Sequence, residues 1–155
     1  MDLLYQCIYS SVAIEHLDAR AVGQLLDDSR RANEAAGITG MLLQCNGSFL
    51  QVLEGRPDAL ENAFEWIYSD PRHNAIAQIA FEPVTHRAFG DWSMAYTDLA
   101  VADIAKIIGP LNAFQETRCL AKLDAARVRV LCSAFETAPW RDWLHNDVHE
   151  HARSA

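Results

Sequence analysis

The chain has 155 residues, of which 50% are hydrophobic and 22% are charged, a balance typical of one soluble globular domain with a short extension. Its formal net charge of −8 argues against nucleic acids and anionic membranes as partners, because both attract basic surfaces. No apolar run approaches the roughly 20 residues of a membrane span, and the N-terminus lacks the basic region of a signal peptide, so we expect a cytoplasmic protein.

The chain opens with patterns that predict a strand, a helix and a hairpin. Apolar and polar residues nearly alternate over residues 3–11, as in a strand with one buried face. Residues 16–37 show the apolar spacing of a helix, with an aspartate near the start as N-cap and a glycine at the end. Two strands are predicted at 38–45 and 49–55, and the Asn-Gly pair between them is a strong signal for an antiparallel hairpin.

A second helix and two further strands follow. Residues 56–70 predict the helix, which carries a proline in its first turn, and the strands are predicted at 76–84 and 91–97. The resulting order predicts an α+β fold, a ferredoxin-like βαββαββ sheet with two helices on one face. In this topology the first and third strands lie side by side at the centre of the sheet, under the first helix.

The character of the chain changes near residue 98, where helical patterns begin. We therefore divide the chain into a sheet domain at residues 1–97, a C-terminal helical extension at 98–145 and a flexible tail at 146–155. A sheet with helices on one face leaves its other face bare. The extension is expected either to cover that face or to bind a second subunit there.

Sequence motifs for catalysis and metal binding are missing. We find no P-loop, no glycine-rich dinucleotide motif, no zinc-protease motif and no serine-hydrolase motif, so no catalytic residue is predicted. His145 and His149 have metal-ligand spacing, but they lie in the acidic terminal region, and we expect a solvated tail there. The widely spaced cysteines do not form a CxxC pair, and we expect buried, reduced thiols at Cys7, Cys45, Cys119 and Cys132.

Three polar side chains fall where the predicted topology turns them toward one face of the sheet. Gln51 shares a strand face with Phe49, Tyr9 lies on the first strand, and Asn33 lies on the inward stripe of the first helix. Buried amides and hydroxyls cost free energy unless they are hydrogen-bonded. They could satisfy one another, or a flat polar ligand could lie between the helices, because amides match the edge of a heterocycle.

Four segments of the chain together resemble the BLUF domain, the blue-light sensor that uses flavin. They read LLYQCIYSS, ANEAAGITGMLLQCNGSFLQVLEG, DPRH and THRAFGDWSM, and the resemblance runs from Leu3 to Tyr96. It implies that residues 1–97 form a flavin-binding photosensor of the short, single-domain type. The implied chromophore is FAD, with FMN or riboflavin as alternatives.

The resemblance also implies roles for individual residues. Tyr9 matches the tyrosine that donates an electron and a proton to the excited flavin, Gln51 the glutamine that bridges this tyrosine and the flavin, and Asn33 the asparagine that bonds the flavin edge. Trp92 and Met94 match the pair linked to signal output. Further cofactor contacts are implied for apolar walls and for polar residues near the phosphate end, namely Leu25, Phe49, Ile67, Asp70, Arg72 and His73. At Ala32 the family often carries histidine or asparagine, which puts a contact to the O2 side of the flavin in doubt.

The implied activity is that of a switch and not of an enzyme. Light rearranges the hydrogen bonds between tyrosine, glutamine and flavin reversibly, and this changes partner binding or oligomeric state. Short BLUF proteins signal through a separate downstream protein, and homo-oligomers are common among them, so we expect both here. The alternatives are a small flavin-dependent oxidoreductase, which would turn over with a reductant, and a ferredoxin-like ligand-binding adaptor, which would be colourless.

Overall fold

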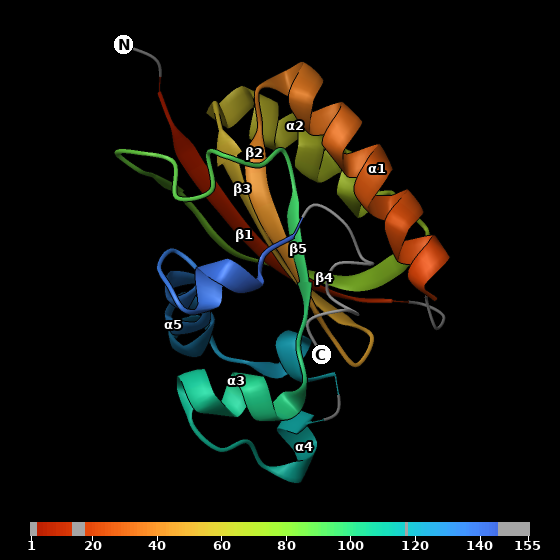
Figure 1. Ribbon diagram of the computed structural model, residues 1–155. Helices are drawn as coiled ribbons and strands as arrows, with labels where there is room; N and C mark the ends of the chain where they lie inside the picture. The colour runs from red at the N-terminus through yellow and green to blue at the C-terminus, as the bar shows by residue number, and fades with distance from the viewer. Residues whose placement is uncertain (1–2, 14–17, 117, 146–155) are drawn as a thin grey trace.

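The structure, a computed structural model, describes residues 3–13, 18–116 and 118–145 and contains one mixed sheet (Figure 1). Its five strands have the order β4-β1-β3-β2-β5. The β2–β5 pair is parallel and the other neighbouring pairs are antiparallel. The sheet and its first two helices comprise β1 (Tyr5–Ala13), α1 (Ala19–Ala36), β2 (Thr39–Cys45), β3 (Ser48–Gly55), α2 (Pro57–Tyr68), β4 (His73–Pro83) and β5 (Ala95–Asp98). The predicted α+β, ferredoxin-like sheet is confirmed, with β1 beside β3 at its centre.

Local sequence signals set the ends of α1 and the turn between β2 and β3. The Asp18 carboxylate accepts a hydrogen bond of 2.8 Å from a backbone N–H in the first turn of α1. Gly37 follows the helix with a φ of 70°, and its backbone N–H donates to carbonyls of the last turn. Asn46 and Gly47 have φ values of 48° and 76°, and a two-residue hairpin turn of this kind requires positive φ at both positions.

The fifth strand is shorter than predicted. We expected a strand over residues 91–97, but β5 covers only Ala95–Asp98, where it pairs with β2. Just before β5, polar side chains of α1 bind the backbone carbonyls of Ser93, at 2.7 Å, and of Met94, at 3.0 Å. These carbonyls are therefore turned toward α1 and do not enter the ladder with β2.

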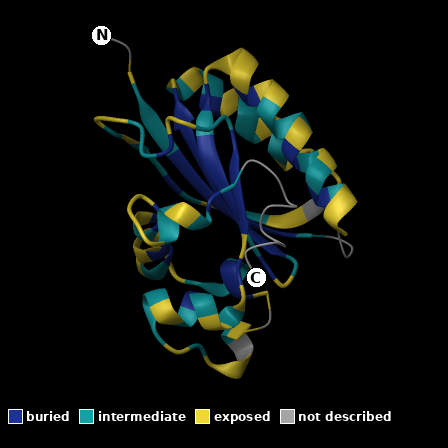
Figure 2. Cartoon of the chain, viewed as in Figure 1, coloured by how far each residue is buried: buried dark blue, intermediate teal, exposed yellow. Residues whose placement is uncertain are grey.

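The sheet is covered on both faces (Figures 1 and 2). α1 and α2 pack on one face, over a buried cluster that includes Cys7, Leu26, Leu60 and Met94. The other face packs against the extension, which comprises α3 (Val101–Ile108), α4 (Ala113–Glu116), the 3₁₀ turn η1 (Cys119–Lys122), α5 (Ala125–Ala134) and the 3₁₀ turn η2 (Trp140–Trp143).

Of the two roles predicted for the extension, the structure therefore shows it covering the second face, while binding of a second subunit stays a prediction. The predicted tail at 146–155 lies outside the described residues. Within the described ranges, no helix is long and apolar enough to cross a membrane.

Candidate functional site

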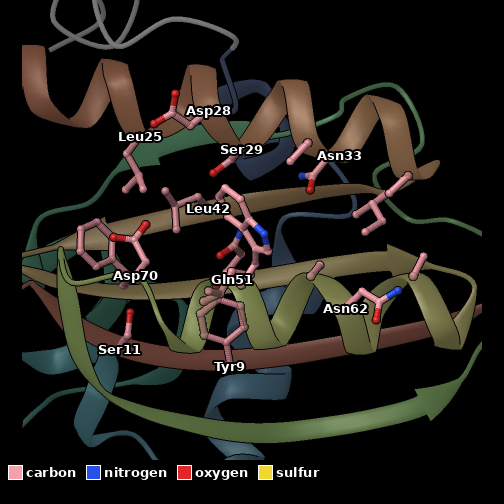
Figure 3. A pocket seen from close by; sticks show the side chains of 18 of the residues that line it. Tyr9, Ser11, Leu25, Asp28, Ser29, Asn33, Leu42, Gln51, Asn62 and Asp70 are labelled. Carbon is pink, nitrogen blue, oxygen red and sulfur yellow. The ribbon is translucent and has the colours of Figure 1, made fainter.

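A cavity of about 430 Å³ lies between α1 and α2, with the sheet as its floor (Figure 3). Its volume falls within the range of small-molecule sites, roughly 300–1,000 Å³. The floor comes from the three central strands: β1 contributes Tyr9 and Ser11, β3 contributes Phe49 and Gln51, and β2 contributes Leu42. Residues far apart in the chain thus meet at one place because the strand order brings β1, β3 and β2 together.

Tyr9 and Gln51 stand directly opposite each other across the β1–β3 ladder. Directly opposed side chains on one face of an antiparallel pair have Cβ atoms about 5 Å apart, so the two side chains are neighbours. Figure 3 shows both on the cavity side of the sheet. They are only 2% and 6% exposed. Burial, with smaller contributions from Cys7 and Asp70, raises the pKa of Tyr9 well above its usual value, so its phenol is a neutral hydrogen-bond donor.

The Gln51 amide has a weak partner at its nitrogen. Its Nε2 donates to the thioether sulfur of Met94 at 3.5 Å. A thioether is a weak acceptor, so this bond compensates little of the cost of burying an amide. Met94 itself is fully buried beside the cavity floor and is the last residue before β5. The Gln51 side chain is therefore both desolvated and able to gain from a better partner in the cavity.

Asn33 contributes a second buried amide from α1. The side chain is 5% exposed and lines the cavity. Its Nδ2 donates to the carbonyl of Ser93 at 2.7 Å. Arg30, one turn earlier, donates its Nε to the carbonyl of Met94 at 3.0 Å. α1 thus holds the chain that leads into β5, a function of Asn33 that its sequence position did not reveal.

A network of charges lies at one end of the cavity. Arg72 donates from Nε and Nη2 to the Asp70 carboxylate, at distances between 2.6 and 3.0 Å, and from Nη1 to Asp28 at 3.2 Å. This pairing raises the pKa of Arg72 further, so the cation is permanent, and it joins α1 to the turn after α2. All three residues line the cavity. An incoming anion would share Arg72 with two carboxylates.

The exposed edge of the cavity carries a tryptophan that the sequence did not point to. Trp66 on α2 lines the cavity and is 73% exposed. Asp58 and Asn62 also line it, and the three positions are spaced by four residues, so they form one row along the outer edge of α2. The inner row, Ala59, Ala63 and Ile67, is apolar. This spacing of a polar row beside an apolar row on α2 was the sequence signal that could have identified Trp66.

Most of the predicted site residues lie around this one cavity. The structure brings together Tyr9, Leu25, Asn33, Phe49, Gln51, Ile67, Asp70 and Arg72. His73 begins β4, and its side chain lies outside the described part of the chain. Ala32 lines the cavity with a methyl group only. Residues that we did not predict also line it: Ser11, Asp28, Ser29, Leu42, Asn62 and Trp66.

The two residues predicted for signal output are separated by the structure. Met94 faces the cavity side and touches Gln51. Trp92 packs against the cluster on the other face of the sheet, and the Arg141 guanidinium lies 4.7 Å from its ring centre. Arg141 also donates to the Ala88 carbonyl at 2.8 Å. Trp92 is therefore in contact with the C-terminal extension, while Met94 is in contact with the site.

The cavity has the properties of a site for a flat aromatic ligand with one polar edge. Apolar side chains from both helices face each other across it, among them Leu25 and Ile67. Hydrogen-bonding groups that are almost fully desolvated gather on its floor and on α1. Amides carry both donors and acceptors, so they match a heterocycle edge on which carbonyl and nitrogen positions alternate.

Comparison with known proteins gives the family. The family described as "BLUF: Sensors of blue-light using FAD" matches residues 4–95. A photoactivated adenylate cyclase subunit beta from Euglena longa is 33% identical over 87 residues, which is 56% of this chain and 10% of that protein. The blue light- and temperature-regulated antirepressor BluF of Escherichia coli K12 is 28% identical over 97 residues, 63% of this chain and 24% of that protein.

A solved structure extends this similarity beyond the matched segment. The photo-activated state of BlsA is 25% identical and superposes with a TM-score of 0.74, over 87% of this chain and 96% of that one. The curated relatives above, in contrast, are matched over only 10% and 24% of their own length. The match of residues 4–95 covers more than half of the sequence, and the chain belongs to the BLUF family of blue-light sensors, whose domains bind a flavin.

Proposed function

We propose that this chain is a non-catalytic blue-light switch in which a flavin lies between α1 and α2 and is held by Tyr9, Gln51 and Asn33. The observation that carries the proposal is the direct opposition of Tyr9 and Gln51 on the cavity floor, with both side chains desolvated. The residues present fit a flavin, because the Gln51 amide donates to a thioether, which is a weak acceptor, and faces an apolar-walled cavity.

A bound flavin supplies a strong one-electron oxidant when it absorbs blue light. The protein supplies the proton path and the readout. Tyr9 keeps its proton at Oη in the dark because burial raises its pKa. The neighbouring Gln51 amide would relay that proton, accepting one at its oxygen while it gives one up from its nitrogen, and would be left rotated or in its other tautomer when a proton returns to Tyr9. Because the two groups are shielded from water, a change in one hydrogen bond polarises the next.

The contact between Met94 and Gln51 depends on the orientation of the Gln51 amide. In the structure the amide nitrogen, and not the oxygen, faces the Met94 sulfur. A thioether accepts hydrogen bonds but cannot donate them. Rotation of the amide by half a turn would therefore replace an attractive N–H···S contact by one between two lone-pair-bearing atoms. Met94 would then repack, and it is the residue directly before β5.

β5 connects this site to the C-terminal extension. Tyr96 on β5 exchanges two backbone hydrogen bonds of 2.8 Å with His145, the last described residue. On the other side, α1 holds Met94 and Ser93 by their carbonyls. We propose that repacking of Met94 shifts the contacts between β5 and residues 98–145. The output would be altered binding of a separate signalling protein or altered self-association. The similarity to the antirepressor BluF supports a protein partner.

The cofactor that we propose is FAD. FAD differs from FMN by an adenine nucleotide that must extend beyond the ring pocket. Trp66 offers an exposed aromatic surface at the edge of the cavity, and stacking of a base on an aromatic side chain stabilises a complex by about 1–3 kcal/mol. Arg72 would contact the phosphates of FAD and FMN alike, so Trp66 is the residue that distinguishes the two.

The proposal is tested by recording the visible spectrum of the purified protein before, during and after blue light. We expect a yellow protein whose flavin band shifts slightly to the red and returns in darkness. A colourless protein would contradict flavin binding. Bleaching of the flavin with a thiol or a nicotinamide reductant, followed by turnover, would identify an oxidoreductase instead.

A further inference from the structure

Two cysteines that are far apart in the sequence meet on the face of the sheet opposite the cavity. The sulfur atoms of Cys45 and Cys119 lie 2.9 Å apart, although 74 positions separate the residues. Cys45 ends β2, and Cys119 begins η1 in the C-terminal extension. Both side chains are 0% exposed. The pair therefore lies at the junction between the sheet and the helices that cover it.

Ser48 on β3 holds the two segments in place at this junction. Its hydroxyl donates to the carbonyl of Cys45 and accepts from the backbone N–H of Leu120 at 3.1 Å. η1 is thus attached to the sheet directly beside the sulfur pair. The hydrogen bond between the thiols lowers the pKa of Cys119 and raises that of Cys45, so Cys119 loses its proton first. A thiolate is the nucleophile in disulfide exchange.

We propose that Cys45 and Cys119 form a reversible disulfide that fixes the C-terminal extension to the sheet. The sulfur atoms are in direct contact at 2.9 Å, so only a small movement would bring them to the disulfide bond length of about 2.05 Å. The disulfide would join β2, the strand that pairs with β5, to the C-terminal extension, whose contacts with β5 are proposed to shift. It does not involve the cavity and would form with or without a bound flavin.

The oxidant is a small-molecule disulfide, for which oxidised glutathione is the probe. The Cys119 thiolate attacks one sulfur, the S–S bond of the oxidant breaks, and the first thiolate leaves and takes up a proton. Cys45 then loses its proton and attacks the Cys119 sulfur of the mixed disulfide, which releases the second thiolate. Two protein thiols are oxidised by two electrons, and one small disulfide is reduced to two thiols.

Burial makes the reaction dependent on opening of the junction. Because both sulfurs are fully buried, the oxidant reaches Cys119 only when η1 leaves the sheet transiently. After the second step, the bond joins two residues that are 74 positions apart and removes conformational freedom from the unfolded chain. The oxidised protein should therefore unfold at a temperature higher by at least about 5 °C.

The test uses the flavin-loaded protein, incubated with oxidised glutathione in buffer and, in parallel, in urea below the unfolding transition. Acid quenching, alkylation under denaturing conditions and peptide mass spectrometry then report the state of each thiol. We expect loss of two free thiols, one peptide that links Cys45 to Cys119, the predicted rise in unfolding temperature, and reversal by dithiothreitol. C45S and C119S should each abolish the linked peptide.

The matched control is C132S, because Cys132 is also buried in the cluster on this face of the sheet but lies on α5. This variant should form the Cys45–Cys119 link as the natural chain does. Four free thiols under both conditions would overturn the proposal. So would linked peptides that contain Cys7 or Cys132, or an oxidised protein whose unfolding temperature is unchanged.

Discussion

We predict that Tyr9 and Gln51 act as one energetic unit, which a double-mutant cycle measures. The single changes are Tyr9→Phe and Gln51→Leu, each of which roughly keeps the side-chain volume. In the proposed switch these two side chains are hydrogen-bonded, and removing one member of such a buried pair leaves the other unsatisfied and costs about 1–3 kcal/mol. Removing both leaves no unsatisfied group. The double variant should therefore be less destabilised than the sum of the singles, by about 1 kcal/mol, in the range found for contacting polar groups.

The assay combines urea unfolding of the flavin-loaded protein with a light-minus-dark spectrum. All three variants should bind flavin and lack the red shift. Tyr96→Phe is the matched control, because Tyr96 is a buried tyrosine on the same face of the sheet and donates its hydroxyl to Gln44 at 2.8 Å, outside the cavity lining. It should lose stability and keep the red shift. Additivity of the two single changes, or a red shift in any cycle variant, would refute the reasoning.

Three further predictions follow from the site. Trp66→Ala should weaken FAD binding about tenfold and leave the FMN and riboflavin affinities unchanged in fluorescence titrations. Tyr68→Ala, which changes an exposed tyrosine of the same helix, should change none of the three affinities. Equal losses for all three flavins would exclude adenine stacking. Met94→Leu should preserve the red shift but change the dark recovery rate, measured by spectroscopy. It should also alter the light-dependent change in partner binding or oligomeric state, measured by size-exclusion chromatography. If neither quantity changes, Met94 does not transmit the orientation of the Gln51 amide. Because burial raises the pKa of Tyr9, its contribution to stability is complete below about pH 10, the pKa of an unfolded tyrosine, and is lost as the pH rises further. Urea unfolding should therefore show a smaller loss of stability above pH 10 in Tyr9→Phe than in the unchanged protein, and equal losses in the two proteins would contradict a raised pKa.

The elements of the fold could be predicted because their signals are local. Asp18 caps α1 with its own side chain, Gly37 ends it in a conformation that glycine adopts easily, and Asn46 and Gly47 make the hairpin turn. The exception was the segment from residue 91 to 94. Its strand-like pattern was overridden because side chains of α1 bind the carbonyls of Ser93 and Met94, and those partners lie some 60 residues earlier in the chain.

The centre of the site was also predictable, since the topology places β1 beside β3 and the motifs single out Tyr9, Gln51 and Asn33. The rim was not. Asp28 on α1 lines the cavity and is paired there with Arg72, which follows α2. Trp66 lines the cavity because the outer row of α2 side chains lies along the cavity edge. Neither residue carries a local signal for ligand binding, because an exposed tryptophan or an aspartate on a helix is compatible with a simple solvated surface.

Apart from the start of the fifth strand, the sequence by itself determined the sheet strands and the helices packed on them, and their order, because hydrogen-bonded caps, turns and apolar periodicity act between near neighbours. Its motifs also determined the family. Only the tertiary structure decided which contacts form through space. It placed Met94 against the site and Trp92 against Arg141, two side chains that lie two positions apart and face different clusters. It also brought together Cys45 and Cys119, which the sequence predicted as separate buried thiols. Such contacts depend on how the helices pack on the sheet, and no short stretch of the chain encodes that packing.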